Sequence, residues 1–245
     1  MNTINKIAVF DLETTGLDLA HSKIVTACVA VIDFEGNLIG EPNEWLADPG
    51  VEIPAVAAEV HGVTTEFAIA NGRPLAEVVG EINAKLAELF AEGIPVVAYN
   101  ASYDFTILKS NSDALGLAAI NEPKPVLDPL VLDRRFDKWR KGKRTLSVTT
   151  ELYNVSLGED AHNATADAIA AGRVALAVLK KFNLLDAYTL ADLHEGQIGW
   201  SLEQDISFNK FLEGLGKPQI TDFGWPIRGT SAAQEVHVKA ELLDE

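Results

Sequence analysis

Cysteine is nearly absent from this chain of 245 residues, and long apolar runs are absent altogether. The single cysteine, Cys28, excludes an internal disulfide and a cluster of thiolate ligands for zinc. No run approaches the ~18 consecutive apolar residues that a membrane helix needs, and residues 1–10 lack the pattern of a secretory signal. The composition therefore predicts a soluble, cytoplasmic protein with no membrane partner.

Basic residues are also scarce, because 20 Lys and Arg face 36 Asp and Glu and give a net charge of −16. Binding of nucleic-acid phosphates normally needs a surplus of positive charge. A protein that binds phosphates through metal ions needs fewer basic residues, because the ions supply positive charge locally. A protein that holds only the end of a nucleic-acid strand also needs fewer contacts with phosphates. The charge therefore argues only against strong, processive binding of duplexes by this chain alone.

Apolar segments follow one another in an order typical of an α/β protein. Segments that resemble strands occupy residues 6–12, 24–33, 38–46, 95–99 and 126–130. Helices are expected from Pro74 to Gly93, after a cap at Ser102, and from Ala164 to Phe182. This order predicts a ribonuclease-H-like mixed sheet with flanking helices. The pattern changes near Leu184, which predicts a domain over residues 1–183 and a C-terminal helical appendage with a polar tail over 184–245.

Two acidic residues end the first expected strand. Asp11 and Glu13 are two positions apart, so their carboxylates point to the same side of the strand. Such a pair is costly unless a cation lies between the two groups, and hard divalent ions prefer carboxylate ligands. A solvated strand end explains this pair equally well on its own.

Three further residues are weaker candidates when each is taken alone. Asp104 falls in the first turn of an expected helix, where an acid also complements the helix dipole. His162 and Asp167 are five positions apart and would be rotated by ~140° on one helix. We therefore expect Asp167 on the helix and His162 on the preceding loop, where an imidazole can accept a proton from water. A surface histidine is the plain alternative.

Taken together, these segments resemble the DEDDh (DnaQ-like) 3′–5′ exonucleases, which include the epsilon proofreading subunit of bacterial replicases. The first motif is matched by Asp11-Leu12-Glu13-Thr14-Thr15-Gly16, with Leu12 where Thr is often found. The second is matched by residues 100–104, with Tyr103 in place of the usual Phe, and the third by residues 162–168. The resemblance covers about residues 6–182, and the remainder is similar to actinobacterial or phage-type members.

The resemblance implies a two-metal hydrolysis of phosphodiester bonds at a 3′ end, with release of nucleoside 5′-monophosphates. Asp11, Glu13, Asp104 and Asp167 would hold two divalent ions, Mg²⁺ or Mn²⁺, and His162 would act as the general base. The segment 60–64 matches a family loop that lies beside the terminal nucleotide. The residues implied in substrate binding are Leu12, Thr14, Thr15, Gly16, His61, Asn100 and Tyr103.

A basic segment stands out in this acidic chain. Seven of the 20 basic residues fall within positions 134–144, together with Phe136 and Trp139. Cations interleaved with aromatic rings suit single-stranded nucleic acid, because phosphates bind the cations and bases stack on the rings. The side chains predicted to contact substrate are Trp139, Arg140, Lys141, Lys143 and Arg144. A solvated helix face is the alternative interpretation.

We therefore expect a metal-dependent exonuclease that acts on the 3′ end of nucleic acid. DNA is favoured over RNA as the substrate, and single-stranded DNA is favoured over duplex DNA. An RNA-trimming exoribonuclease would use the same motifs. A non-catalytic module that binds a polymerase is the alternative from another class, and the intact set of five catalytic-type residues argues against it. The appendage is a candidate surface for binding a polymerase or a second copy of the chain.

Overall fold

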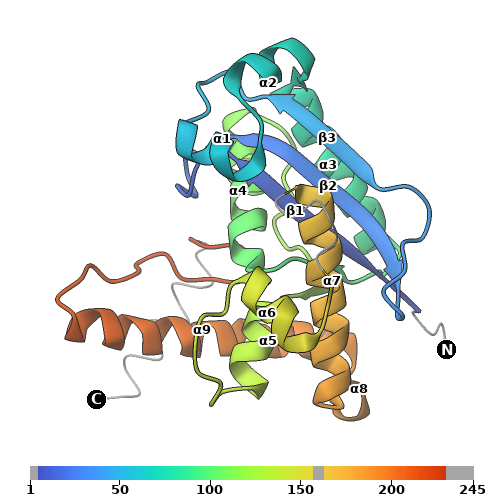
Figure 1. Cartoon of the computed structure of the whole chain (residues 1–245), viewed down its shortest axis with the longest axis vertical. Coiled ribbons are helices and arrows are strands. Elements are labelled where there is room, and N and C mark those ends of the chain that lie inside the picture. Colours follow the sequence, from blue (N-terminus) through green and yellow to red (C-terminus); the bar gives the residue numbers. More distant parts are fainter. Residues whose placement is uncertain (1–4, 157–162, 230–245) are drawn as a thin grey trace.

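The computed structural model describes residues 5–156 and 163–229. A six-stranded mixed sheet forms its centre, in the order β4-β3-β2-β1-β5-β6 (Figure 1). The antiparallel part contains β1 (Lys6–Thr14), β2 (Ile24–Asp33) and β3 (Asn43–Asp48). Two short strands, β5 (Val96–Val97) and β6 (Val126–Leu127), continue the sheet parallel to β1, and β4 (Arg73–Pro74) pairs with β3. The predicted mixed α/β sheet is confirmed.

Helices cover both faces of this sheet (Figure 1). One face packs against α3 (Leu75–Ala91) and α4 (Ala101–Ala114), and the other packs against α7 (Ala164–Lys181). The remaining helices are α1 (Ala55–His61), α2 (Thr65–Asn71), α5 (Pro129–Phe136), α6 (Leu146–Tyr153), α8 (Leu184–Ala187) and α9 (Leu190–Gly214). Within the described residues, no helix combines the length and apolar character that crossing a membrane would require.

The central strand β1 is apolar on both sides because both faces of the sheet are covered. Ala8 and Phe10 belong to the core beneath α3 and α4, whereas Ile7 and Val9 belong to the core beneath α7. A strand buried on both faces reads as a continuous apolar run rather than as an alternating one. This explains why the apolar run in the sequence predicts β1 clearly.

Several expected element boundaries were wrong, and the strand expected over 95–99 covers only Val96–Val97. The third strand begins at Asn43 rather than at residue 38, and Leu38 only forms an isolated bridge with Ile32. The strand expected over 126–130 ends at Leu127, because Asp128 caps α5 and Pro129 opens that helix. Ser102 lies inside α4 and does not cap it.

The free amides at the start of α4 are instead bound by a distant side chain. The Asn100 and Ala101 N–H groups donate to the Asp128 carboxylate at 3.0 and 2.9 Å. Asn100 itself has a φ of 63°, the left-handed conformation that asparagine tolerates better than most residues. Asp128 therefore fixes the beginnings of two helices, α4 and α5.

The C-terminal helix α9 closes the edge of the sheet at β6. Gln197 accepts from the Asp128 N–H at 2.7 Å and donates to the Val126 carbonyl at 3.1 Å. The Val126 N–H donates to His194 at 3.1 Å. These side chains replace a neighbouring strand, so α9 satisfies backbone groups that an open edge would leave exposed.

Residues beyond α9 return to the main core, where Trp225 and Ile227 join the cluster beneath α3 and α4. The Trp225 indole donates to the Asp128 carboxylate at 3.3 Å. The division of the chain at residue 183 stays a prediction. Its second part nevertheless contributes to the packing of the first.

Two glycines in helices give a matched test of packing against the sheet. A Cβ on Gly172 of α7 would lie 2.4 Å from Val9 and 2.7 Å from Ile32, whereas one on Gly80 of α3 would meet nothing within 4 Å. We expect Gly172→Ala to destabilise the fold by about 1–3 kcal/mol through overpacking. Gly80→Ala should stabilise it by about 0.5–1 kcal/mol, since alanine favours a helix. Urea denaturation measures both, and equal signs would contradict the close approach of α7.

Candidate active site

Two of the candidate carboxylates lie on one side of β1, as their spacing predicted. Asp11 and Glu13 are half-buried and flank the buried Leu12. They share the side of the strand that carries Ile7 and Val9, which faces α7.

The helix on that side, α7, carries the candidate Asp167 in its first turn. The Asn163 side chain caps this helix by accepting from the Thr165 and Ala166 N–H groups at 2.9 and 3.0 Å. Asp167 is thus fixed on the helix that packs against β1, as expected. His162 lies outside the described residues, so its role stays a prediction.

The fourth carboxylate reaches β1 from α4. The Leu12 N–H donates to Asp104 at 3.1 Å. The neighbouring strand β5 ends at Val97, opposite Val9, so β1 has no strand partner on this side at Leu12. Asp104 therefore occupies the position where the parallel sheet stops.

These four carboxylates influence one another electrostatically. Burial, followed by the charges of Asp104, Glu13 and Asp167, raises the pKa of Asp11 well above its usual range. Burial and the Asp167 charge raise the pKa of Glu13 to about 7. The pKa of Asp104 is also raised, mainly by burial. Nearby positive charge would lower these pKa values and favour the ionised carboxylates.

The donor set fits divalent ions in its chemistry, since four carboxylates from three elements offer only oxygen ligands. Within residues 5–156 and 163–229, however, no group of three or more His, Cys, Asp or Glu side chains stands ready to hold an ion. The role of these carboxylates as metal ligands is therefore a proposal.

The segment after Glu13 is held against α4 by a tyrosine. The Tyr103 hydroxyl lies 2.6 Å from the Thr14 hydroxyl and donates to the Gly16 carbonyl at 2.8 Å. The Thr15 N–H donates to the Lys23 carbonyl at 2.9 Å. Tyr103 and Thr14 thus brace a loop beside the carboxylates, and the predicted substrate contacts of these residues remain untested.

His61 ends α1, which the sequence did not indicate, and lies near the backbone of Thr14. Its Nδ1 accepts from the Val63 N–H at 3.2 Å, which leaves the proton on the buried Nε2 atom. Burial lowers the pKa of His61 and favours this neutral form. The structure therefore places His61 beside the first motif, where a ligand contact was predicted.

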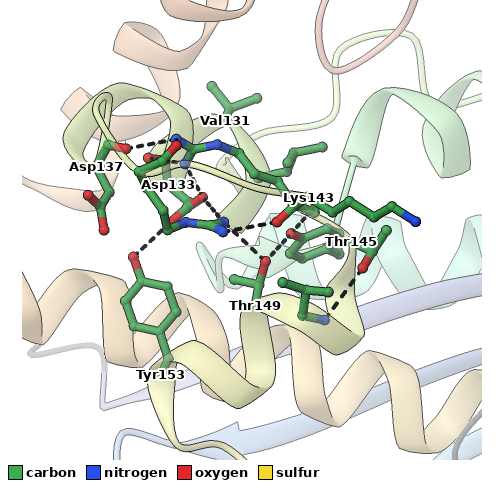
Figure 2. A network of polar contacts seen from close by, with 12 residues as sticks. Val131, Asp133, Asp137, Lys143, Thr145, Thr149 and Tyr153 are labelled. Carbon is green, nitrogen blue, oxygen red and sulfur yellow. Dashed lines mark hydrogen bonds and ion pairs between the residues drawn. The ribbon is translucent and has the colours of Figure 1, made fainter.

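The basic segment contains a structural core that the sequence analysis missed (Figure 2). The Asp133 side chain is fully buried and bound by two arginines, Arg140 at 2.6 Å and Arg144. The Tyr153 hydroxyl donates to the same carboxylate at 2.8 Å. Burial tends to raise the pKa of Asp133, but hydrogen bonds from Arg140, Tyr153 and Arg144 outweigh it and hold that pKa below its usual range.

The members of this segment therefore divide into two groups. Arg140 and Arg144 are largely engaged inside the protein, where Arg144 also donates to the Asp137 carbonyl at 2.8 Å. Lys141 and Lys143 are exposed, and Trp139 is 87% exposed. Residues of the second group are accessible to a substrate, and the Lys138 ammonium lies 5.6 Å from the centroid of the Trp139 ring.

Comparison with known proteins identifies the family of this chain. The exonuclease family model RNase_T matches residues 8–175, so the chain belongs to this family, that of the DEDDh-type 3′–5′ exonucleases. The matched region contains β1, α4 and the first part of α7, which are the three elements that carry the carboxylates.

Curated relatives include PolC-type DNA polymerase III proteins. The Streptococcus thermophilus protein is 29% identical over 202 residues, which cover 82% of this chain and 13% of that protein. The Streptococcus agalactiae protein is 31% identical over 173 residues, 71% of this chain and 11% of that protein. The chain thus matches only a small part of either relative.

Solved structures with the same fold include two forms of exonuclease I. The enzyme from Methylocaldum szegediense superposes with a TM-score of 0.60 at 22% identity, covering 75% of this chain and 43% of that one. The Escherichia coli enzyme in complex with a dT13 oligonucleotide gives 0.59 at 21% identity, covering 74% and 43%. These likenesses establish the ribonuclease-H-like exonuclease fold.

The buried ion pair allows a comparison of two neighbouring residues. We expect Arg144→Ala to destabilise the fold by about 3 kcal/mol, because it leaves part of the buried Asp133 charge uncompensated. Lys143→Ala, at an exposed position without an ion pair among the described residues, should change stability by less than about 0.5 kcal/mol. Denaturant titration at neutral pH measures both.

The pH dependence of this difference follows from the lowered pKa of Asp133. The ion pair contributes fully above the ordinary pKa of an aspartate, about 3.9, and its contribution is lost as pH falls through the lower folded value. The gap between Arg144→Ala and wild type should therefore shrink in acid. Equal stability of the two variants at neutral pH would contradict the role assigned to Arg144.

Proposed function

We propose that this protein is a metal-dependent 3′–5′ exonuclease that hydrolyses DNA from the 3′ end, preferably as a single strand. The observation that carries the proposal is the gathering of Asp11, Glu13, Asp104 and Asp167 beside β1. Three of them have pKa values raised by burial and by neighbouring carboxylates. Bound cations would favour the ionised form of these carboxylates. Perturbed pKa values of this kind are concentrated at catalytic sites.

Asp11, Glu13, Asp104 and Asp167 are the residues that would hold two divalent ions, Mg²⁺ or Mn²⁺. When bound, such ions activate water and stabilise the charge of the leaving oxygen. Asp104 stays oriented by the Leu12 N–H, and Asp11 is carried by a strand buried on both faces. His162 would accept the proton of the attacking water.

The terminal nucleotide would lie against the backbone of residues 12–16 and beside His61. The bracing of Thr14 and Gly16 by Tyr103 gives this backbone a defined position. A fixed surface reduces the entropy lost when a flexible strand end is oriented for attack. These contacts would leave the bases without specific recognition, as suits removal of any terminal nucleotide.

Relatives support DNA as the substrate. The curated relatives are named DNA polymerase III, and exonuclease I has been solved with dT13 and dA16 oligonucleotides and, with single-stranded DNA, in a zinc-bound form. Partnership with a polymerase is a further proposal that rests on these names. RNA trimming remains the alternative that a direct assay must separate.

The first test of the proposal is hydrolysis of end-labelled DNA and RNA of equal sequence. We expect stepwise shortening of DNA from the 3′ end in Mg²⁺ or Mn²⁺, none in EDTA, and slower loss of RNA. Asp104→Asn should abolish hydrolysis because it removes a proposed ligand. Asp113→Asn, at an exposed position of the same helix paired with Lys109, is the matched control and should retain activity.

The stability of the metal-free protein provides a second readout for the same variants. Because the pKa of Asp104 is raised, its ionisation opposes folding at neutral pH. Asp104→Asn should therefore melt at a higher temperature than wild type in EDTA while being inactive. Full wild-type activity in EDTA would exclude the metal-dependent mechanism.

The general base is tested by His162→Ala. We expect the rate of hydrolysis to fall by ~10²–10⁴ with folding intact, because the attacking water loses its proton acceptor. Raising the pH should partly restore the rate, since hydroxide then forms without assistance. His21→Ala, at an exposed site paired with Asp18, is the control. An unchanged rate in the His162 variant would assign the base role elsewhere.

A further inference from the structure

A groove of about 620 Å³ runs between α5 and α9. Its wall on the α5 side includes Arg134 and Lys138, and its wall on the α9 side includes Phe208 and Phe211. Asn100 and Arg228 also line it. We refer to this feature as the α5–α9 groove.

Positive charge remains uncompensated in the groove. Arg135 pairs with Glu203 across it at 3.2 Å, and Arg228 pairs with Asp205 at 2.9 Å. Within the described part of the chain, Arg134 and Lys138 have no acidic partner within ion-pair distance, and both are exposed. In a chain of net charge −16, two such cations in one groove indicate a ligand of negative charge.

Two aromatic side chains are exposed in the same groove. Phe208 and Phe211 are 47% and 59% exposed, and their ring centroids lie 6.1 Å apart at an interplanar angle of 25°. Positions three apart share one side of a helix, so both rings face the same way from α9. Exposed rings beside cations are the combination that binds single-stranded nucleic acid without regard to sequence.

The groove reaches the start of α4, the helix that carries Asp104. Asn100 lines the groove and immediately precedes this helix. The Arg228 N–H donates to the Thr106 hydroxyl of the same helix at 2.9 Å. A strand whose 3′ end lies at the carboxylates would therefore meet the groove with the nucleotides that precede that end.

We propose that the α5–α9 groove binds the single-stranded segment preceding the 3′-terminal nucleotide, with phosphates at Arg134 and Lys138 and bases on Phe208 and Phe211. This inference rests on the proposed function for the identity of the strand end. It gives α9 a role in substrate binding in addition to its role in closing the sheet. It also assigns the stacking of bases to Phe208 and Phe211 of α9 rather than to Trp139 alone.

Binding in EDTA tests the groove without hydrolysis. The measurement is fluorescence anisotropy of a 5′-labelled oligothymidylate of about 12 nucleotides, titrated with full-length protein at several salt concentrations. Phe208→Ala with Phe211→Ala should weaken binding at least about tenfold and leave the salt dependence unchanged, because stacking releases no counterions. Arg134→Ala with Lys138→Ala should flatten the slope of log K against log salt by about 1.4.

Two exposed residues outside the groove serve as matched controls, Lys210 of α9 for charge and Leu215, the residue after α9, for apolar surface. Lys210→Ala and Leu215→Ala should bind the oligonucleotide as wild type does. All variants change exposed side chains, and their melting temperatures identify any loss of folding. The Arg134→Ala single variant provides the charge test if either double variant melts early.

Hydrolysis of two substrates separates the groove from the active site. The p-nitrophenyl ester of thymidine 5′-monophosphate occupies only the terminal position, so both groove variants should cleave it at the wild-type rate in Mn²⁺. Their kcat/KM on the oligonucleotide should fall about tenfold, mainly through KM. If both variants bind and cleave the oligonucleotide as wild type does, the proposal that the α5–α9 groove binds the single strand is overturned.

Two other results have distinct meanings. If wild type cleaves neither substrate, the proposed function fails, and the titration in EDTA still decides whether the groove binds single strands. If the phenylalanine variant loses self-association in sedimentation but keeps oligonucleotide affinity, the groove is an interface between copies of this chain and the proposal is overturned.

Discussion

Repulsion between the carboxylates around β1 is the constraint on which the rest of this structure depends. Asp11, Glu13 and Asp104 are held where burial and their neighbours raise each pKa, so their ionised forms oppose folding. The surrounding elements must supply the stability that this arrangement removes. β1 does so through burial on both faces, and α7 does so through small residues that bring it close to the sheet. The carboxylates thus lie around a strand that is buried on both faces.

The site also depends on a residue that contributes no catalytic group. Asp128 accepts from the backbone at the start of α4, caps α5 and receives the Trp225 indole, while its own N–H is held by Gln197. The orientation of α4, and hence of Asp104, is therefore linked to the C-terminal segment. Five donors around one buried carboxylate leave it little freedom to move, which suits a positioning role.

The sequence predicted the sheet and the positions of Asp11, Glu13 and Asp167 on their elements, because both depend on local rules. Alternation along β1 placed Asp11 and Glu13 on one side, and the helical position of Asp167 followed from its spacing to His162. The partners of Asp128 and Asp133 could not be predicted in this way, because they join residues far apart in the chain. Arg140 and Arg144 illustrate the difference, since a basic run looks the same whether its charges face solvent or a buried acid. The Asp128-Pro129 pair is typical of the start of a helix, with a capping aspartate followed by proline. These two residues had been assigned to the end of a strand instead.

The side chains of Gln197 and His194 on the edge of β6 have a consequence for how this protein can be divided. A fragment that ended near residue 183 would retain every family motif but would expose the backbone of β6 along a free edge. Such an edge recruits other strands and favours aggregation. Recombinant production of the catalytic core by itself would therefore tend to yield insoluble material, and the shortest well-behaved unit should extend through Ile227.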